Sequence, residues 1–152
     1  MKNMLLLLLL FFLVPVAFAQ TDNPRYDKTL AESLGGDDYG MKPYVLVILK
    51  TGSNKIDSKP VIDSLFRGHM ENIDRLAASK KLVVAGPLKK NDKAYRGIFI
   101  LDVRTIEEAG SLILTDPAVN AKLLEAELFQ WFGSAALPEY LKIHEKIEKK
   151  KM

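Results

Sequence analysis

The sequence predicts an α+β fold in which four strands form an antiparallel sheet and two helices cover one of its faces. Short apolar runs rich in β-branched residues alternate with longer segments whose apolar residues recur every three or four positions. The chain has 152 residues and is 48% hydrophobic, which is enough for one domain with a proper core. It contains no cysteine, which excludes disulfides, thiol catalysis and cysteine metal sites.

Residues 1–19 are predicted to be an export signal peptide. Lys2 gives a positive start, residues 5–14 are continuously apolar, and Ala17-Phe18-Ala19 forms a small-x-small cleavage site. A retained anchor is the alternative, but a membrane span needs about 20 apolar residues. We therefore expect a periplasmic or secreted protein that makes no membrane contact after cleavage.

The strands are predicted from apolar runs that end at turn residues. Residues 20–41 are a lead segment in which residues 26–34 form a short helix that Gly35-Gly36 end. The first strand, at 44–49, is apolar at every position, which indicates burial on both faces. The other strands are predicted at 82–88, 95–103 and 124–132.

The two main helices are predicted from their capping residues and periodicity. One runs from Pro60 to Ser79, because proline suits a first helical turn. The other opens at Thr105, which with Glu108 fits a capping box, and stops at 115–117, before a short turn at 118–120. After these elements, residues 134–152 are an extension in which a charged amphipathic helix is predicted from 137 to 150.

The order of these elements is βαββαβ, which is the ferredoxin-like arrangement. The two helices cover one face of the sheet, yet the first strand is apolar on both faces. A second copy of the chain, stacked sheet on sheet as a homodimer, is the simplest cover for the other face.

His69 lies in the middle of the apolar face of the first main helix. The residues that define this face are Ile62, Leu65, Phe66, Ile73 and Leu76. The imidazole should therefore point inward, where a ring nitrogen without a partner costs about 1–3 kcal/mol. A partner from another part of the chain is expected.

Several short motifs recur together between residues 42 and 133. They are 44–49, Gly68 to Leu76 with its histidine, 82–87, 97–101, 107–109, Thr115 to Ala118, and Trp131. With these motifs the segment from 42 to 133 is similar to the YciI-like or YCII-related domain proteins of the dimeric α+β barrel group. The resemblance implies a ferredoxin-like monomer that dimerises through its sheet. It also implies a cleft with a His/Asp pair proposed to be catalytic, which falls on His69 and Asp116. The family's reaction is generally unassigned.

A carboxylate bonded to one nitrogen of His69 would fix its tautomer and make the other nitrogen a general base. Such a base suits proton abstraction beside a carbonyl, isomerisation or water activation. The alternative is structural, because an Asp before a Pro is an ordinary helix N-cap and an inward His is often a satisfied core residue. Arg96, Trp131 and Gly86 are the candidates for contact with a substrate.

Two function classes follow from these residues. One is a small-molecule enzyme, an isomerase, lyase or hydrolase, that uses His69 and Asp116 as a general-base pair in a cleft near the dimer interface. The other is a non-catalytic dimeric binding or accessory module, and haem held by His69 is a third, minor option. We predict no cofactor and no metal, since no ligand cluster is present. The formal charge of +3 is spread along the chain, which gives no case for nucleic acid.

Overall fold

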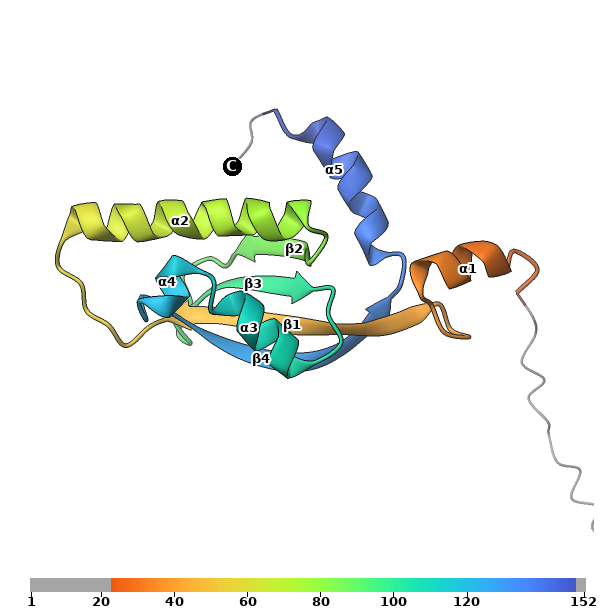
Figure 1. The fold of residues 1–152 in the computed structure, drawn as a ribbon, viewed down its shortest axis with the longest axis horizontal. Helices are drawn as coiled ribbons and strands as arrows, with labels where there is room; N and C mark the ends of the chain where they lie inside the picture. The colour runs from red at the N-terminus through yellow and green to blue at the C-terminus, as the bar shows by residue number, and fades with distance from the viewer. Residues whose placement is uncertain (1–22, 150–152) are drawn as a thin grey trace, which may run out of the picture.

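The computed structural model describes residues 23–149, so the predicted signal peptide lies outside the described residues. Figure 1 shows a four-stranded sheet with helices packed against it and a C-terminal helix standing apart. The elements are α1 (Lys28–Leu34), β1 (Met41–Thr51), α2 (Lys59–Ala78), β2 (Leu82–Pro87), β3 (Tyr95–Leu101), α3 (Ile106–Ile113), α4 (Pro117–Asn120), β4 (Leu124–Ser134), the 3-10 helix η1 (Leu137–Tyr140) and α5 (Leu141–Ile147).

The strand order is β2-β3-β1-β4, and every neighbouring pair is antiparallel. This order confirms the predicted ferredoxin-like arrangement. β1 lies in the centre and pairs with β4 along its whole length, from Met41 opposite Ser134 to Thr51 opposite Leu124. Because β1 pairs with β3 on its other side, it holds the two halves of the fold together.

The main core lies between the sheet and helices α2, α3 and α4. Alternate residues of β1 and β3 point into it, because successive side chains in a strand face opposite ways. The buried residues of this core are Val45, Val47, Leu49, Ile73, Leu76, Leu82, Phe99, Leu101, Val103, Ala109, Ile113, Ala118 and Leu124.

The opposite face of the sheet is apolar but only partly covered. Leu46 and Ile48 of β1 lie on it and are half-buried, so the predicted burial of both faces of β1 is not reached within one chain. Tyr44 also belongs to this face and is fully buried, with its ring against Trp131 and its hydroxyl donating to the carbonyl oxygen of Ser134. This face of the sheet is therefore covered at Tyr44 but leaves a partly exposed apolar surface around Leu46 and Ile48.

Three predicted details differ from the structure. Residues 118–120, predicted as a turn, belong to the single-turn helix α4, because the Asp116 carboxylate accepts the backbone N–H groups of Ala118 and Val119 and Pro117 has no N–H that needs a partner. The C-terminal helix is shorter than predicted and begins as a 3-10 turn. The hydroxyl of Thr105 caps Glu108 N at 3.1 Å, but the carboxylate of Glu108 bonds Lys81, so only half of the capping box forms.

Within residues 23–149, no helix has the length and apolar character that crossing a membrane requires.

Candidate functional site

A close contact between α2 and α4 sets up the candidate site. A Cβ atom added at Gly68 would lie 2.8 Å from Cγ of Pro117, so only glycine allows this approach without a shift. His69 follows Gly68 in the sequence, and Asp116 precedes Pro117. The absence of a side chain at Gly68 thus brings the two predicted catalytic residues within reach of each other.

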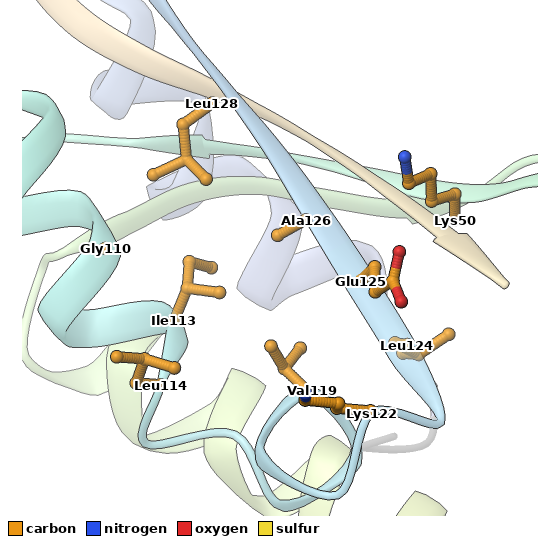
Figure 2. Close-up of a pocket in the computed structure, with 10 residues that line it drawn as sticks. All are labelled: Lys50, Gly110, Ile113, Leu114, Val119, Lys122, Leu124, Glu125, Ala126 and Leu128. Atoms are coloured by element: carbon orange, nitrogen blue, oxygen red, sulfur yellow. The ribbon is translucent and has the colours of Figure 1, made fainter. Parts of the chain in front are cut away.

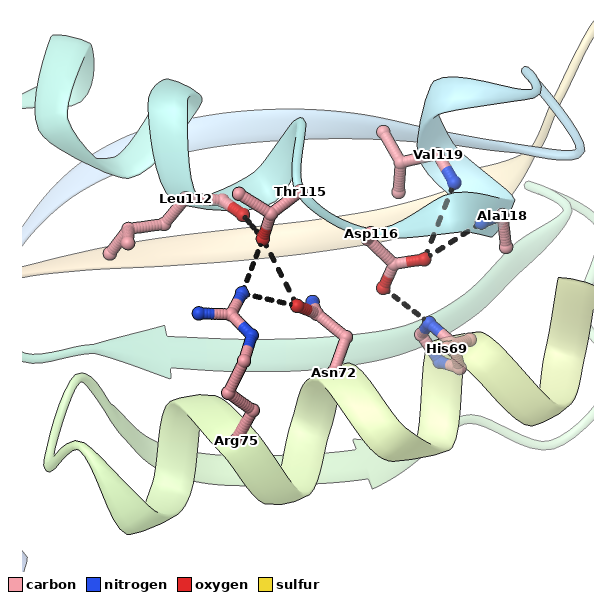
Figure 3. A network of polar contacts seen from close by, with 8 residues as sticks. All are labelled: His69, Asn72, Arg75, Leu112, Thr115, Asp116, Ala118 and Val119. Carbon is pink, nitrogen blue, oxygen red and sulfur yellow. Dashed lines mark hydrogen bonds and ion pairs between the residues drawn. The ribbon is translucent and has the colours of Figure 1, made fainter.

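The His69 and Asp116 side chains meet directly, with Nδ1 and Oδ2 2.6 Å apart (Figure 3). Asp116 is fully buried, and the side chain of His69 is 12% exposed. The other carboxylate oxygen of Asp116, Oδ1, accepts the N–H groups of Ala118 at 2.9 Å and Val119 at 3.4 Å. The two carboxylate oxygens therefore have different partners: Oδ1 caps the N-terminus of α4, and Oδ2 contacts Nδ1 of the imidazole.

Two phenyl rings flank the imidazole of His69. Phe99 of β3 stacks on it with a centroid distance of 5.9 Å and an angle of 22°, and Phe66 meets it edge-on at 6.2 Å. In the part of the chain that the structure describes, no hydrogen bond occupies Nε2. Because Nε2 is also absent from the fully buried, unpartnered atoms there, it keeps some accessible surface. The arrangement presents one free ring nitrogen between apolar walls.

A second polar contact ties α2 to the same segment one turn further along. Arg75 Nη2 donates to Asn72 Oδ1 and to Thr115 Oγ1, both at 2.6 Å, and Thr115 Oγ1 lies 3.0 Å from Asn72 Oδ1 (Figure 3). Asn72 Nδ2 is the one side-chain nitrogen or oxygen among residues 23–149 that is fully buried with no partner. This network was not predicted from the sequence, although Asn72 follows His69 by three positions and so shares its inward face.

The structure does not bring the predicted substrate-contact residues to the His/Asp pair within one chain. Trp131 pairs with Tyr44 across β1 and β4, on the face of the sheet opposite to His69. Gly86 is in register with Ile98, and a Cβ at Gly86 would meet nothing within 4 Å. Arg96 is exposed and precedes Gly97 in β3. These three residues lie along the sheet rather than around the imidazole.

Two grooves lie away from His69. One, of about 480 Å³, runs between α3, α4 and the edge strand β4 (Figure 2). Its apolar walls include Ile113, Val119 and Leu128. The other, of about 430 Å³, is polar and lies between α1, the start of β1 and the segment after β3. Among the described residues, no group of three or more His, Asp or Glu side chains is arranged to hold a metal ion.

Charged side chains gather at the end of β4 that faces the first groove. Lys50 Nζ bonds Glu127 at 2.8 Å, and this hydrogen bond is the main cause that raises the pKa of Lys50. Hydrogen bonds from Ser53 lower the pKa of Glu125. Both groups are thus held in their charged forms, which makes this end of the sheet an ion-paired rim rather than a reactive centre.

Comparison with known proteins decides the family. The model of the YCII-related domain matches residues 44–131, which run from the buried tyrosine of β1 to the tryptophan of β4. The chain belongs to the YCII-related domain family. The matched range lies inside the predicted domain at 42–133 and includes both His69 and Asp116. α1 and α5 are outside the YCII-related domain.

Two relatives are similar to this YCII-related domain. The uncharacterized protein YjpA of Bacillus subtilis (strain 168) is 28% identical over 88 residues, which are 58% of this chain and 94% of YjpA. The structure of 5-chloro-2-hydroxyhydroquinone dehydrochlorinase (TftG) from Burkholderia phenoliruptrix AC1100, in complex with 2,5-dihydroxybenzoquinone, matches with a TM-score of 0.41 and 22% identity. That match covers 57% of this chain and 92% of TftG.

Proposed function

We propose that this protein is an exported small-molecule enzyme in which His69 acts as a general base and Asp116 orients it. The observation that carries the proposal is the 2.6 Å contact between Nδ1 and a fully buried carboxylate oxygen, combined with a free Nε2. The carboxylate accepts the proton on Nδ1, which leaves the lone pair on Nε2 available.

The surroundings of Nε2 favour a small substrate with an apolar body and an acidic C–H or O–H group. Phe66 and Phe99 line the imidazole and offer few polar contacts of their own. Proton abstraction beside a carbonyl, isomerisation and water activation all fit a single base of this kind.

The second candidate is a non-catalytic module in which the pair only joins α2 to α4. It is supported by the capping bonds of Asp116 to Ala118 and Val119, which a purely structural aspartate would also make. The two candidates differ in what they require of Nε2, since only the enzyme needs this nitrogen to be unprotonated and reachable.

Acylation by diethyl pyrocarbonate tests this difference, because the lone pair of an unprotonated imidazole nitrogen attacks a carbonyl carbon of the reagent and displaces ethyl carbonate. The chain holds two histidines, so His144 in the exposed α5 serves as an internal reference. We expect His69 to react in a folded protein. We also expect His69→Asn, whose amide nitrogen replaces Nδ1 as a donor to Asp116 but which has no Nε2, to keep the fold.

The functional half of the test follows hydrogen–deuterium exchange into a panel of small carbonyl compounds and hydroxylated quinones by NMR. The parent chain and His144→Asn should catalyse exchange, and His69→Asn should not. If His69 resists acylation, or if His69→Asn exchanges a substrate as fast as the parent does, the general-base proposal is wrong and the structural module is favoured.

We also propose that a second copy covers the open face of the sheet. The apolar residues on this face are Leu46, Ile48, Val84, Ile98, Ile100 and Phe129, and Phe129 is 47% exposed. Ile98 lies in register with both Ile48 and Gly86, near the middle of the sheet. Ile98→Lys should therefore halve the mass measured by light scattering, whereas Leu114→Lys, at the exposed C-cap of α3, should not. A parent chain of monomeric mass would contradict this proposal.

A further inference from the structure

Within residues 23–149, strand β4 forms one edge of the sheet, with β1 on one side and no strand on the other. Two backbone bonds just beyond the ends of β4 show which residues pair with the β1 side. Gly52 N donates to Leu123 O at 2.9 Å, and Ala135 N donates to Gly40 O at 2.8 Å. The register has no shift between these bonds, and antiparallel bonds alternate along a strand, so the odd-numbered residues of β4 bond β1. The N–H and C=O groups of its even-numbered residues therefore point outward.

Strand β4 lacks the features that usually protect an edge strand. Bulges, prolines and free charges normally keep such a strand from pairing with another chain. β4 has 11 residues and no proline, and its pairing with β1 has no bulge. Its two charged side chains are already bonded, Glu125 to Ser53 N at 3.0 Å and Glu127 to Lys50 Nζ at 2.8 Å. The other edge strand, β2, has a register shift and ends at Pro87, so β4 is the edge better suited to another extended segment.

The apolar groove of about 480 Å³ runs along this edge (Figure 2). Ala126 and Leu128 of β4 line the groove, and their side chains lie on the same side of the strand as Ile113 and Val119. Leu114, at the C-cap of α3, also lines it and is 63% exposed. Ala126 and Leu128 are even-numbered, so the residues with outward backbone groups also direct their side chains to the groove. Because opposite residues of paired strands share a face, a strand added to β4 would place every second side chain there.

The charges at this edge cancel. Lys50, Lys122 and Glu125 line the groove, and Glu127 bonds Lys50 beside it. Their sum is +2 − 2 = 0. A segment with a net charge of either sign therefore gains no net attraction here, and an uncharged segment matches the site.

We propose that the β4 edge binds an extended, uncharged peptide segment with apolar side chains at alternate positions. The backbone of the segment pairs with the outward groups of β4, and its apolar side chains contact Ile113 and Leu114 in the groove. A second copy that paired through its own β4 would leave the groove empty, because Leu124 and Leu128 of that strand pack in its own core. A compact ligand would fill the groove but leave the backbone groups of β4 unpaired. A segment without helices of its own satisfies both.

Fluorescence anisotropy tests this binding with a labelled synthetic peptide in which valine and threonine alternate. Both ends of the peptide are blocked, so that it carries no charge. The control peptide has the same sequence but is methylated on its backbone nitrogens, which removes the N–H groups that a strand needs. We expect the protein to bind the first peptide and not the second. Binding should change little with salt, because no net charge is neutralised.

Amide hydrogen–deuterium exchange followed by NMR locates the bound peptide. In the free protein the N–H groups of Ala126 and Leu128 should exchange faster than those of Glu125 and Glu127, which bond β1. Saturating peptide should slow the exchange of Ala126 and Leu128 by about tenfold or more. This readout distinguishes pairing with the strand from contact with the groove alone.

Two variants test the strand and the groove separately. Ala126→Pro removes an outward N–H that does not bond β1, which an edge strand tolerates. Leu114→Lys places a charge in the groove without altering β4. Both should weaken peptide binding by about tenfold or more, and Leu114→Lys decides if Ala126→Pro does not fold by circular dichroism. Val61→Lys is the matched control, because Val61 of α2 is 46% exposed and lies outside the groove, and its binding should equal that of the parent.

Several outcomes would overturn this proposal. They are no binding of the peptide up to about 1 mM, equal binding of the methylated peptide, and unchanged binding by Leu114→Lys. Binding that leaves the exchange of Ala126 and Leu128 unchanged would place the peptide elsewhere. If Ala126→Pro has a smaller mass by light scattering than the parent, the edge pairs with another copy and the peptide proposal is wrong. His69→Asn and Ile98→Lys should bind the peptide as the parent does, so this proposal fails separately from the proposed function and from the proposed dimer.

Discussion

Replacing Asp116 with asparagine tests whether the carboxylate sets the protonation of His69. Oδ1 of Asp116 accepts two backbone N–H groups, and Oδ2 lies 2.6 Å from Nδ1 of the imidazole. The asparagine oxygen must take the position between the two N–H groups, which turns its amide nitrogen toward Nδ1. Two donors cannot face each other, so the imidazole proton moves to Nε2 and the free base is lost.

The expected change in stability follows from what asparagine keeps. A hydrogen bond to a charged group contributes about 1.5–3 kcal/mol, and a neutral one contributes about 0.5–1.5 kcal/mol. The cap of α4 survives in Asp116→Asn, so the free energy of unfolding should fall by only about 1–2 kcal/mol. Asp116→Ala loses the cap as well, which is worth about 0.5–2 kcal/mol more, and leaves Nδ1 without a partner.

The tautomer is measured directly by long-range ¹H–¹⁵N spectra of the two imidazoles at about pH 8, where an ordinary imidazole is neutral. Nε2 of His69 should be unprotonated in the parent and protonated in Asp116→Asn. Acylation of His69 by diethyl pyrocarbonate should slow by about tenfold or more, because the bare nitrogen is then the enclosed Nδ1. The same tautomer and the same acylation rate in both proteins would refute the role given to Asp116.

Further predictions concern three other positions. Gly68→Ala should lower the urea midpoint, because its Cβ would lie 2.8 Å from Pro117, whereas Gly110→Ala, with open space in α3, should raise stability by up to about 1 kcal/mol. Burial raises the pKa of Tyr44 from 10.0 to about 12. The folded state thus binds the phenol proton more tightly than the unfolded state does, so this contribution to stability is complete below pH 10 and is lost as the pH rises toward 12. In urea unfolding between pH 10 and 12, the free energy of unfolding should therefore fall less in Tyr44→Phe than in the parent chain. Gly133→Ala places a Cβ where the Trp131 indole lies, so the fluorescence of this single tryptophan should shift to the red as the ring becomes exposed. An unchanged spectrum would contradict the packing of that ring on Gly133.

Local signals were sufficient to predict most elements of this fold. The apolar run of β1 and the capping residues Pro60 and Thr105 lie within a few positions of the structure they specify. His69 and Asp116 are 47 positions apart in the sequence. Their contact was predicted from the family resemblance, together with the position of His69 on the inward face of its helix. Nothing local marks the approach of Gly68 to Pro117, because that contact depends on how α2 and α4 pack.

The faces of the sheet show why the substrate-contact residues could not be placed from the sequence. Whether Trp131 shares a face with His69 depends on the register between β1 and β4, and a shift of one residue would reverse it. In the structure Trp131 is opposite Tyr44, whose neighbour Val45 points to the helices, so Trp131 faces away from the imidazole.

This separation makes the two proposed roles of the sheet independently testable. His69 and Asp116 contact residues of α2, α4 and β3 on the face of the sheet that the helices cover, whereas Ile98 lies on the open face. Ile98→Lys should therefore change the mass of the protein and leave the acylation rate of His69 unaltered. If that rate changes together with the mass, the second copy must contribute to the surroundings of Nε2, and the reactive site would belong to the dimer rather than to one chain.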